Sequence, residues 1–166
     1  PAIQSVYGIF DDGKIGKSEL NFLEKIISNS IQIINLGNFE ADMKKNVIMI
    51  SSDHRSTLFS EAASASFHAD GWQVYSLGDM SSSIDVLFDL DLQKFLTKVW
   101  KSGMGIMIIV IFSSTDESMK FFVESINSIK AKSRRNLYLV VCDDMKKNSE
   151  TKADLIEEDI ESILQW

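Results

Sequence analysis

Polar side chains that could bind a ligand gather at four places along the chain, each directly after an apolar segment. These stretches read SSDHRST (51–57), GDMSSS (78–83), SSTDES (113–118) and CDDMKK (142–147). The first contains His54, one of only two histidines. A neutral imidazole on a loop is a good ligand for a transition metal or for a metal-bearing cofactor, although many loop histidines are simply solvated. His54 is therefore the candidate metal ligand.

Several other kinds of chemistry lack their motifs in this sequence. No glycine-rich GxGxxG or GxxxxGK[ST] loop is present, so a nucleotide phosphate site is not indicated. No GxSxG segment marks a nucleophilic serine, and we expect no enzymatic activity. A phospho-acceptor receiver would want an aspartate where Ser113 stands and an acidic pair where Asp53 stands alone.

Four apolar segments alternate with helical patterns along most of the chain. The predicted strands are NVIMIS (46–51), WQVYSL (72–77), GIMIIVIF (105–112) and NLYLVVC (136–142), and the predicted helices cover about 57–69, 90–101, 117–129 and 152–164. Strands that are apolar on both faces and separated by helices are typical of a doubly wound, Rossmann-like or flavodoxin-like α/β fold with a parallel sheet. Ligands of such sheets bind beyond the carboxyl ends of the strands. The four polar stretches, which we call the rim, should therefore share one edge.

The N-terminal part of the chain has a different, helical pattern. Residues 17–34 place Leu20, Leu23, Ile27, Ile31 and Ile34 at three- and four-residue spacings, which predicts an amphipathic helix with one buried stripe. PAIQSVYGIF (1–10) is typical of the last turns of an earlier helix, and NLGNFEADMKK (35–45) of a linker. We therefore predict a partial helical bundle over 1–38 and an α/β domain over 46–166.

Composition indicates which partners and which cellular compartment to expect. A net charge of -7 over 166 residues disfavours contact with a nucleic acid backbone. The single cysteine, Cys142, fits a reducing compartment. The longest apolar run, MGIMIIVIF (104–112), is about half of what spans a bilayer. We expect a cytoplasmic protein with no membrane contact.

Taken over nearly all of its length, the chain resembles the cobalamin-binding module of corrinoid proteins and of MerR-type and photosensory regulators. The bundle of those regulators has a pattern like PALREIGRLWEAGEISVAEEHFAS, and this chain has PAIQSVYGIFDDGKIGKSELNFLEK. NVIMISSDHRST is similar to the family's strand followed by a DxHxxG loop, and GWQVYSLG (71–78) matches GxxVxxLG. The last match is the most specific.

The resemblance implies roles for particular residues. It places His54 as the lower ligand of cobalt, with Ser52 and Thr57 where the family has the Asp and the Gly of DxHxxG. It also implies a tunnel beside the sheet for the nucleotide tail of the cofactor. Residues matched to that tunnel and to the upper face of the cofactor are Ser113 and Thr115 (for SxL), Cys142 and Asp143 (for GG), Phe10 (for a capping Trp) and Asn21 (for an upper-ligand His).

The departures from the family pattern have physical consequences. Thr57 adds a branched side chain where the tail passes close to backbone, and Cys142 with Asp143 adds bulk and charge to a tunnel wall. Without the Asp of DxHxxG, the imidazole lacks the acceptor that orients it. A branch of the family contains haem and no nucleotide tunnel, and this pattern is similar to that branch.

The sequence therefore predicts a sensory or regulatory domain that binds a tetrapyrrole, haem or cobalamin, through His54 in a cleft between the bundle and the rim. Its partners would be other domains or subunits of a regulatory protein. Two alternatives stay open at this point. One is a cofactor-free interaction module, and the other is a corrinoid carrier for methyl transfer.

Overall fold

A five-stranded, all-parallel sheet with the strand order β2-β1-β3-β4-β5 lies at the centre of the protein. The computed structural model describes residues 2–37, 39–85, 87–100, 105–133, 136–143, 152–157 and 160–165. The strands are β1 (Asp42–Ser51), β2 (Trp72–Asp79), β3 (Ile106–Ser113), β4 (Leu137–Asp143) and β5 (Leu155–Glu157). The predicted doubly wound, flavodoxin-like α/β fold is confirmed.

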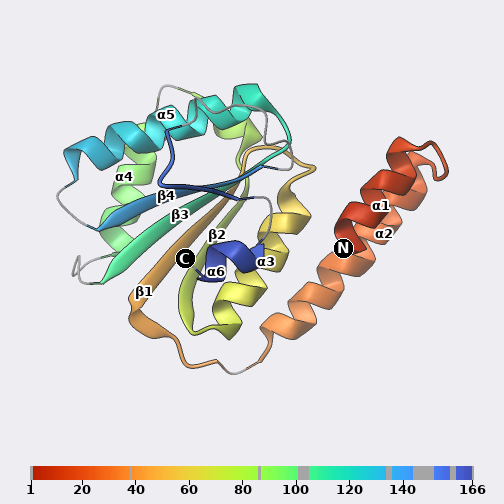
Figure 1. The fold of residues 1–166 in the computed structure, drawn as a ribbon, viewed down its shortest axis with the longest axis horizontal. Coiled ribbons are helices and arrows are strands. Elements are labelled where there is room, and N and C mark those ends of the chain that lie inside the picture. Colours follow the sequence, from red (N-terminus) through yellow and green to blue (C-terminus); the bar gives the residue numbers. More distant parts are fainter. Residues whose placement is uncertain are drawn as a thin grey trace.

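Helices cover both faces of the sheet, and a helical pair adds a further layer (Figure 1). One face packs against α4 (Phe88–Val99) and α5 (Asp116–Lys132), and the other against α3 (Thr57–Ala69) and α6 (Ile160–Gln165). The pair formed by α1 (Ala2–Asp11) and α2 (Lys17–Asn35) lies on the side of α3 that faces away from the sheet. A short 3-10 turn, η1 (Ser81–Ser83), follows β2.

Two of the interior strands, β1 and β3, are buried on both faces, as their continuous apolar sequence predicts. In β1, Ile48 and Ile50 pack toward α4 and α5, whereas Val47 and Met49 pack toward α3 and α6. Successive side chains of a strand point to opposite faces, so one apolar run serves both cores. This burial fixes where β1 and β3 end and therefore where the rim loops begin.

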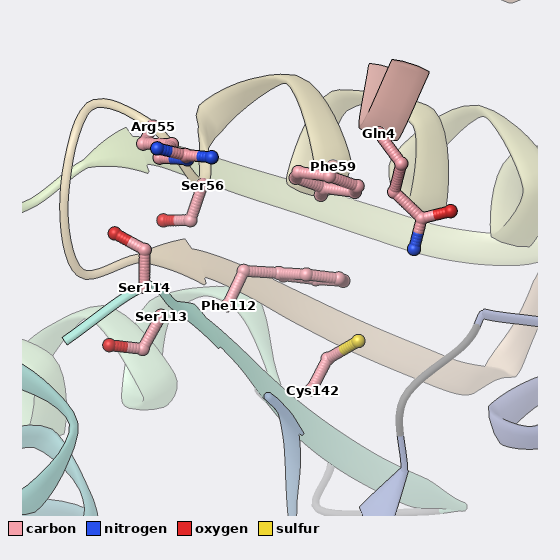
Figure 2. A pocket seen from close by; sticks show the side chains of 8 residues that line it. All are labelled: Gln4, Arg55, Ser56, Phe59, Phe112, Ser113, Ser114 and Cys142. Carbon is pink, nitrogen blue, oxygen red and sulfur yellow. The ribbon is translucent and has the colours of Figure 1, made fainter. Parts of the chain in front are cut away.

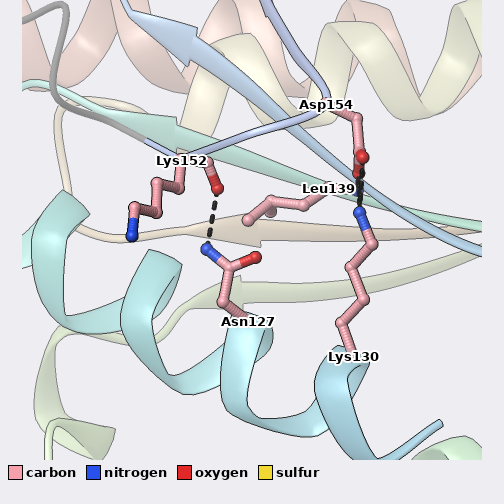
Figure 3. Close-up of polar contacts among 5 residues, drawn as sticks. All are labelled: Asn127, Lys130, Leu139, Lys152 and Asp154. Carbon is pink, nitrogen blue, oxygen red and sulfur yellow. Dashed lines mark hydrogen bonds and ion pairs between the residues drawn. The ribbon is translucent and has the colours of Figure 1, made fainter.

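The predicted helix over 152–164 is wrong in its first half. Residues 155–157 form β5, which pairs with β4, and only 160–165 are helical in the described part of this segment. Asp154 forms an ion pair with Lys130 and accepts a 2.7 Å hydrogen bond from the Leu139 N–H, and Asn127 donates to the Lys152 carbonyl at 2.7 Å (Figure 3). These contacts draw the segment along the edge of β4, and tertiary pairing overrides its helical pattern.

Two further details differ from the sequence prediction. β1 begins at Asp42, so the connection after α2 is shorter than the predicted 35–45 linker. In α2, Leu20 and Ile31 are buried as predicted, but Ile34 is 58% exposed. Among the residues that the structure describes, no helix has the length and apolar character needed to cross a membrane.

The approach of Gly105 to the neighbouring backbone gives a stability prediction. Gly105 has φ +78°, and a Cβ at this position would lie 2.1 Å from the Lys44 carbonyl oxygen. We expect Gly105→Ala to lower the free energy of unfolding in urea by at least about 2 kcal/mol. Gly8→Ala is the control, because a Cβ there meets nothing within 4 Å and alanine in a helix should stabilise by roughly 0.5–1 kcal/mol. Equal stability of Gly105→Ala and wild type would contradict the close approach.

Candidate functional site

The switch point of the sheet lies between β1 and β3, where the strand order reverses and ligands of this fold class bind. Here the rim loops after the two strands touch each other. The buried Ser52 and Ser113 hydroxyl oxygens are 2.6 Å apart, and Ser113 Oγ donates to the Thr115 carbonyl at 2.8 Å. The two loops are thus joined by short polar contacts directly at the expected ligand position.

The Asp53 carboxylate completes this closure. Its Oδ1 accepts the Ser56 N–H at 2.9 Å, its Oδ2 accepts the Ser114 N–H at 2.7 Å, and the Ser52 hydroxyl lies 3.0 Å from Oδ2. Burial alone would raise the pKa of this carboxyl, but the hydrogen bonds from Ser114, Ser56 and Ser52 together outweigh burial and lower the pKa below its usual value. A negative charge that belongs to the protein therefore occupies the switch point.

Beside the closed switch point lies a small cavity of about 50 Å³. Phe112 of β3 lies between Phe59 of α3 and Cys142 of β4 (Figure 2). The lining residues are Gln4, Arg55, Ser56, Phe59, Phe112, Ser113, Ser114 and Cys142. The predicted tunnel residues Ser113 and Cys142 do meet here, but the aromatic rings leave room for little more than one or two water molecules.

A larger hollow, which we call the His54 groove, lies between α2 and α3 and has a volume of about 360 Å³. Three predicted site residues meet in it, namely His54, Thr57 and Asn21. The His54 side chain is 80% exposed, and its Nε2 is 3.9 Å from Glu24 Oε2. The full lining consists of Tyr7, Asn21, Glu24, Lys25, Ser28, His54, Thr57, Leu58 and Glu61. The groove thus joins one accessible imidazole to a mainly polar wall.

Arg55, the neighbour of His54, fastens the helical pair to the rim. Its guanidinium forms an ion pair with Asp11, with Nη1 3.1 Å from Oδ1, and lies 4.9 Å from the centre of the Tyr7 ring. The Tyr7 hydroxyl donates to Glu24 Oε1 at 2.9 Å, and its ring stacks on Phe59. We call the Asp11, Arg55, Tyr7 and Glu24 contacts the latch.

The contacts of the latch shift the pKa values of two of its members, Tyr7 and Asp11. Burial, and then the hydrogen bond to Glu24, raise the pKa of the Tyr7 hydroxyl, so it stays protonated and donating. The hydrogen bond from Arg55 holds the pKa of Asp11 below its usual value. The sequence prediction missed Tyr7 and Glu24. The available signal was a tyrosine on the apolar face of α1, because a buried hydroxyl needs a polar partner.

The remaining predicted site residues lie elsewhere. Phe10 packs in the apolar cluster of Tyr7, Leu20 and Leu58 between the helical pair and α3. Thr115 is the exposed N-cap residue of α5 and lines neither the small cavity nor the His54 groove. The side chain of Asp143, like the whole of Asp144, lies outside the described residues.

Neither a metal cluster nor a role for the second histidine at the groove is found among the described residues. There, no three His, Cys, Asp or Glu side chains gather in an arrangement that could hold a metal ion. His54 would therefore supply a single metal ligand and not a complete metal centre. His68 packs edge-on against Phe39, with ring centres 5.3 Å apart, and does not line the groove.

The pKa shift of Asp53 gives a pH-dependent prediction. A carboxyl whose folded pKa lies below its unfolded value of 3.8 adds stability above pH 3.8, and this stability is lost as the pH falls through the folded pKa. We expect Asp53→Asn to lower the free energy of unfolding at pH 7 by roughly 1–3 kcal/mol, since charged hydrogen bonds are lost. In urea titrations the deficit should shrink below pH 3.8.

The exposed variant Asp12→Asn is the matched control for this experiment, because Asp12 pairs only with the exposed Lys14 in the described structure. It should change stability little at either pH. A deficit for Asp53→Asn that is constant with pH would contradict a charged carboxylate at the switch point.

Comparison with known proteins supports the fold. No protein-family model matches the chain, and no curated protein matches its sequence. Among solved structures, the Methanosarcina barkeri monomethylamine corrinoid protein is similar, with a TM-score of 0.71 and 15% sequence identity over 98% of this chain and 76% of that chain. The chain therefore has the Rossmann-like fold of a corrinoid protein.

Proposed function

We propose that this chain is a non-catalytic regulatory module that couples its helical pair to the sheet, and that a ligand in the His54 groove controls the coupling. One observation carries the proposal. The single rim loop 52–56 closes the switch point through Asp53, exposes His54 to the groove, and holds α1 through Arg55. Its partners would be other domains or subunits of a regulatory protein.

The residues present do not fit a corrinoid whose nucleotide tail enters the sheet. The Ser52–Ser113 contact and the Asp53 carboxylate fill the switch point, and the neighbouring cavity is only about 50 Å³. A nucleotide tail also carries a phosphate, which the Asp53 charge would repel. A carrier for methyl transfer that holds its tail in this way is therefore disfavoured on chemical grounds.

The His54 groove fits the ring of a corrinoid better than it fits haem. Such a ring would supply a metal ion, for which the exposed His54 imidazole would be a suitable ligand. Asn21, Ser28 and Glu61 offer polar atoms to the amide groups around a corrin. Haem has apolar methyl and vinyl edges and two propionate carboxylates. The groove offers mainly Leu58 and the Tyr7 ring to the apolar edges, and it places Glu24 and Glu61 where they would repel the carboxylates. We therefore propose a corrinoid without an inserted tail as the ligand.

A cofactor-free interaction module is the second candidate, and the latch favours it. Arg55 bridges α1 and the rim directly, and Tyr7 stacks on Phe59 across the same boundary. The helical pair is thus already attached to the α/β domain by side chains of the protein. Such a module would transmit a partner's binding with no prosthetic group.

Visible spectroscopy with three probes tests the ligand. Aquocobinamide has no nucleotide tail, hydroxocobalamin has the tail, and haemin offers the alternative ring. We expect aquocobinamide to change its absorption on adding the protein, through an imidazole ligand that His54→Ala removes. Hydroxocobalamin should show no displacement of its own base, because the tail has no path into the sheet. His68→Ala is the matched control, since His68 lies outside the groove and should leave the change intact.

Other outcomes decide between the candidates. A base-off spectrum with hydroxocobalamin that depends on His54 would contradict the closed switch point. No spectral change and no thermal stabilisation with any probe would favour the cofactor-free module, because a ligand of the native state must raise stability. A spectral change on adding haemin that is lost in His54→Ala would show that the ligand of the groove is haem and not a corrinoid.

The coupling itself is tested by hydrogen exchange. Arg55 is about half exposed, so Arg55→Ala should weaken the attachment by at most ~1 kcal/mol, which is about fivefold in local opening. We expect faster amide exchange in α1 and unchanged exchange in β1 and β3. Lys94→Ala, which removes another exposed charged side chain near an aspartate, is the control. An equal increase in the exchange rate of the β1 and β3 amides would show global destabilisation and would contradict the proposed role of the latch.

A further inference from the structure

The outer face of α2 exposes a row of large apolar side chains. Phe22 is 67% exposed, Ile26 46%, Ile33 70%, and Leu36, the C-cap residue, 81%. On the opposite face, Leu20 and Ile31 are buried, and Leu20 packs with Tyr7 of α1 and Leu58 of α3. In Figure 1 the helical pair is the outermost layer of the molecule. A soluble protein rarely leaves such a patch without a partner.

The spacing of this row indicates the kind of partner. Together with the exposed Asn29, the residues follow one another at intervals of four, three, four and three along α2. This is the 3.5-residue repeat of a seam that packs against another helix, and it is narrower than the face that a helix presents to a globular core. We call residues 22, 26, 29, 33 and 36 the α2 seam.

The seam is also nearly symmetric about Asn29. Ile26 lies three residues before it and Ile33 four residues after it, and Phe22 and Leu36 each lie seven residues away. An antiparallel copy centred on Asn29 therefore brings isoleucine against isoleucine, phenylalanine against leucine, and the amide against itself. A twofold interface requires this kind of self-complementary surface.

We propose that a second copy of this chain packs its α2 antiparallel against the α2 seam, about a twofold axis at Asn29. The Asn29 amide can both donate to and accept from Asn29 of the second copy, which makes it suitable for such an axis. The two helical pairs then form a four-helix layer at the interface of the dimer.

Area and charge are compatible with this arrangement. Four large side chains with these exposed fractions carry roughly 500 Å² of accessible surface per copy. Flanking polar side chains bring the face toward the ~800 Å² per partner that a stable interface buries. Lys25 and Gln32 flank the seam on one side, so the antiparallel pairing sets Lys25 near Gln32 of the second copy and opposes no like charges there.

The oligomeric state over a concentration series, measured by light scattering and sedimentation, tests the proposal. Wild type should form a dimer, and Ile33→Lys should raise the dissociation constant at least ~tenfold, because it puts a charge in the seam. Thr97→Lys is the matched control, an exposed helical position on α4 with the same change of charge. A wild type that stays monomeric up to its solubility limit overturns the proposal. A dimer that Ile33→Lys and Ile26→Lys both leave intact overturns it as well.

Disulfide trapping with diamide in a Cys142→Ser background tests the direction of packing. Phe22→Cys mixed with Leu36→Cys should give a cross-linked heterodimer. Phe22→Cys alone should not cross-link, because position 22 of one copy lies far from position 22 of the other in the antiparallel arrangement. Efficient cross-linking of Phe22→Cys with itself would show a parallel pair and overturn the proposed geometry. Circular dichroism of each variant checks that its helical content equals that of the wild type.

Discussion

The Asp53 carboxylate is the constraint on which the arrangement of the rim depends. The parallel sheet brings the N–H groups of the loops after β1 and β3 to one place, and these groups need acceptors. Asp53 accepts from both loops, at Ser56 and at Ser114, from a partly buried position. One residue thereby satisfies two backbone donors, places its charge at the switch point and fixes the turn that leads into α3.

The contacts between the helical pair and the rim follow from the turn that Asp53 fixes. Once Asp53 faces the sheet, His54 and Arg55 face outward, and both side chains are exposed or half exposed. Arg55 reaches Asp11 and the Tyr7 ring, and this positions α1 against the rim. Among the described residues, the apolar cluster that supports the helical pair has three buried members, Tyr7, Leu20 and Leu58, far fewer than either core of the sheet. The polar latch therefore contributes a larger share of the attachment of the helical pair than the same contacts would beside a large apolar core.

Sequence patterns predicted the parts of the fold that depend on local periodicity. The continuous apolar runs in the sequence, and their alternation with helical patterns, predicted the buried strands β1 and β3 and the helix over 57–69. The short strand β5 was not, because its conformation depends on Asp154, Lys130 and Leu139, which are distant in sequence. The resemblance assigned Ser113 and Cys142 to a tunnel apart from the His54 cleft, and these two residues do line a separate cavity. It put Thr57 on the path of the nucleotide tail, whereas Thr57 lines the groove with His54 and Asn21.

A shift of one residue explains why the likeness to a DxHxxG loop and the closed switch point occur together. In that motif the acid stands two residues before the histidine, where this chain has Ser52, and the acid of this chain stands one residue before it. At the end of a strand, adjacent side chains point to different sides. Asp53 therefore bonds to the Ser56 and Ser114 amides, and its hydrogen bonds include none to His54 in the described structure. Moving the carboxylate by one position changes it from a partner of the imidazole into an occupant of the ligand site, so His54 is left to the groove.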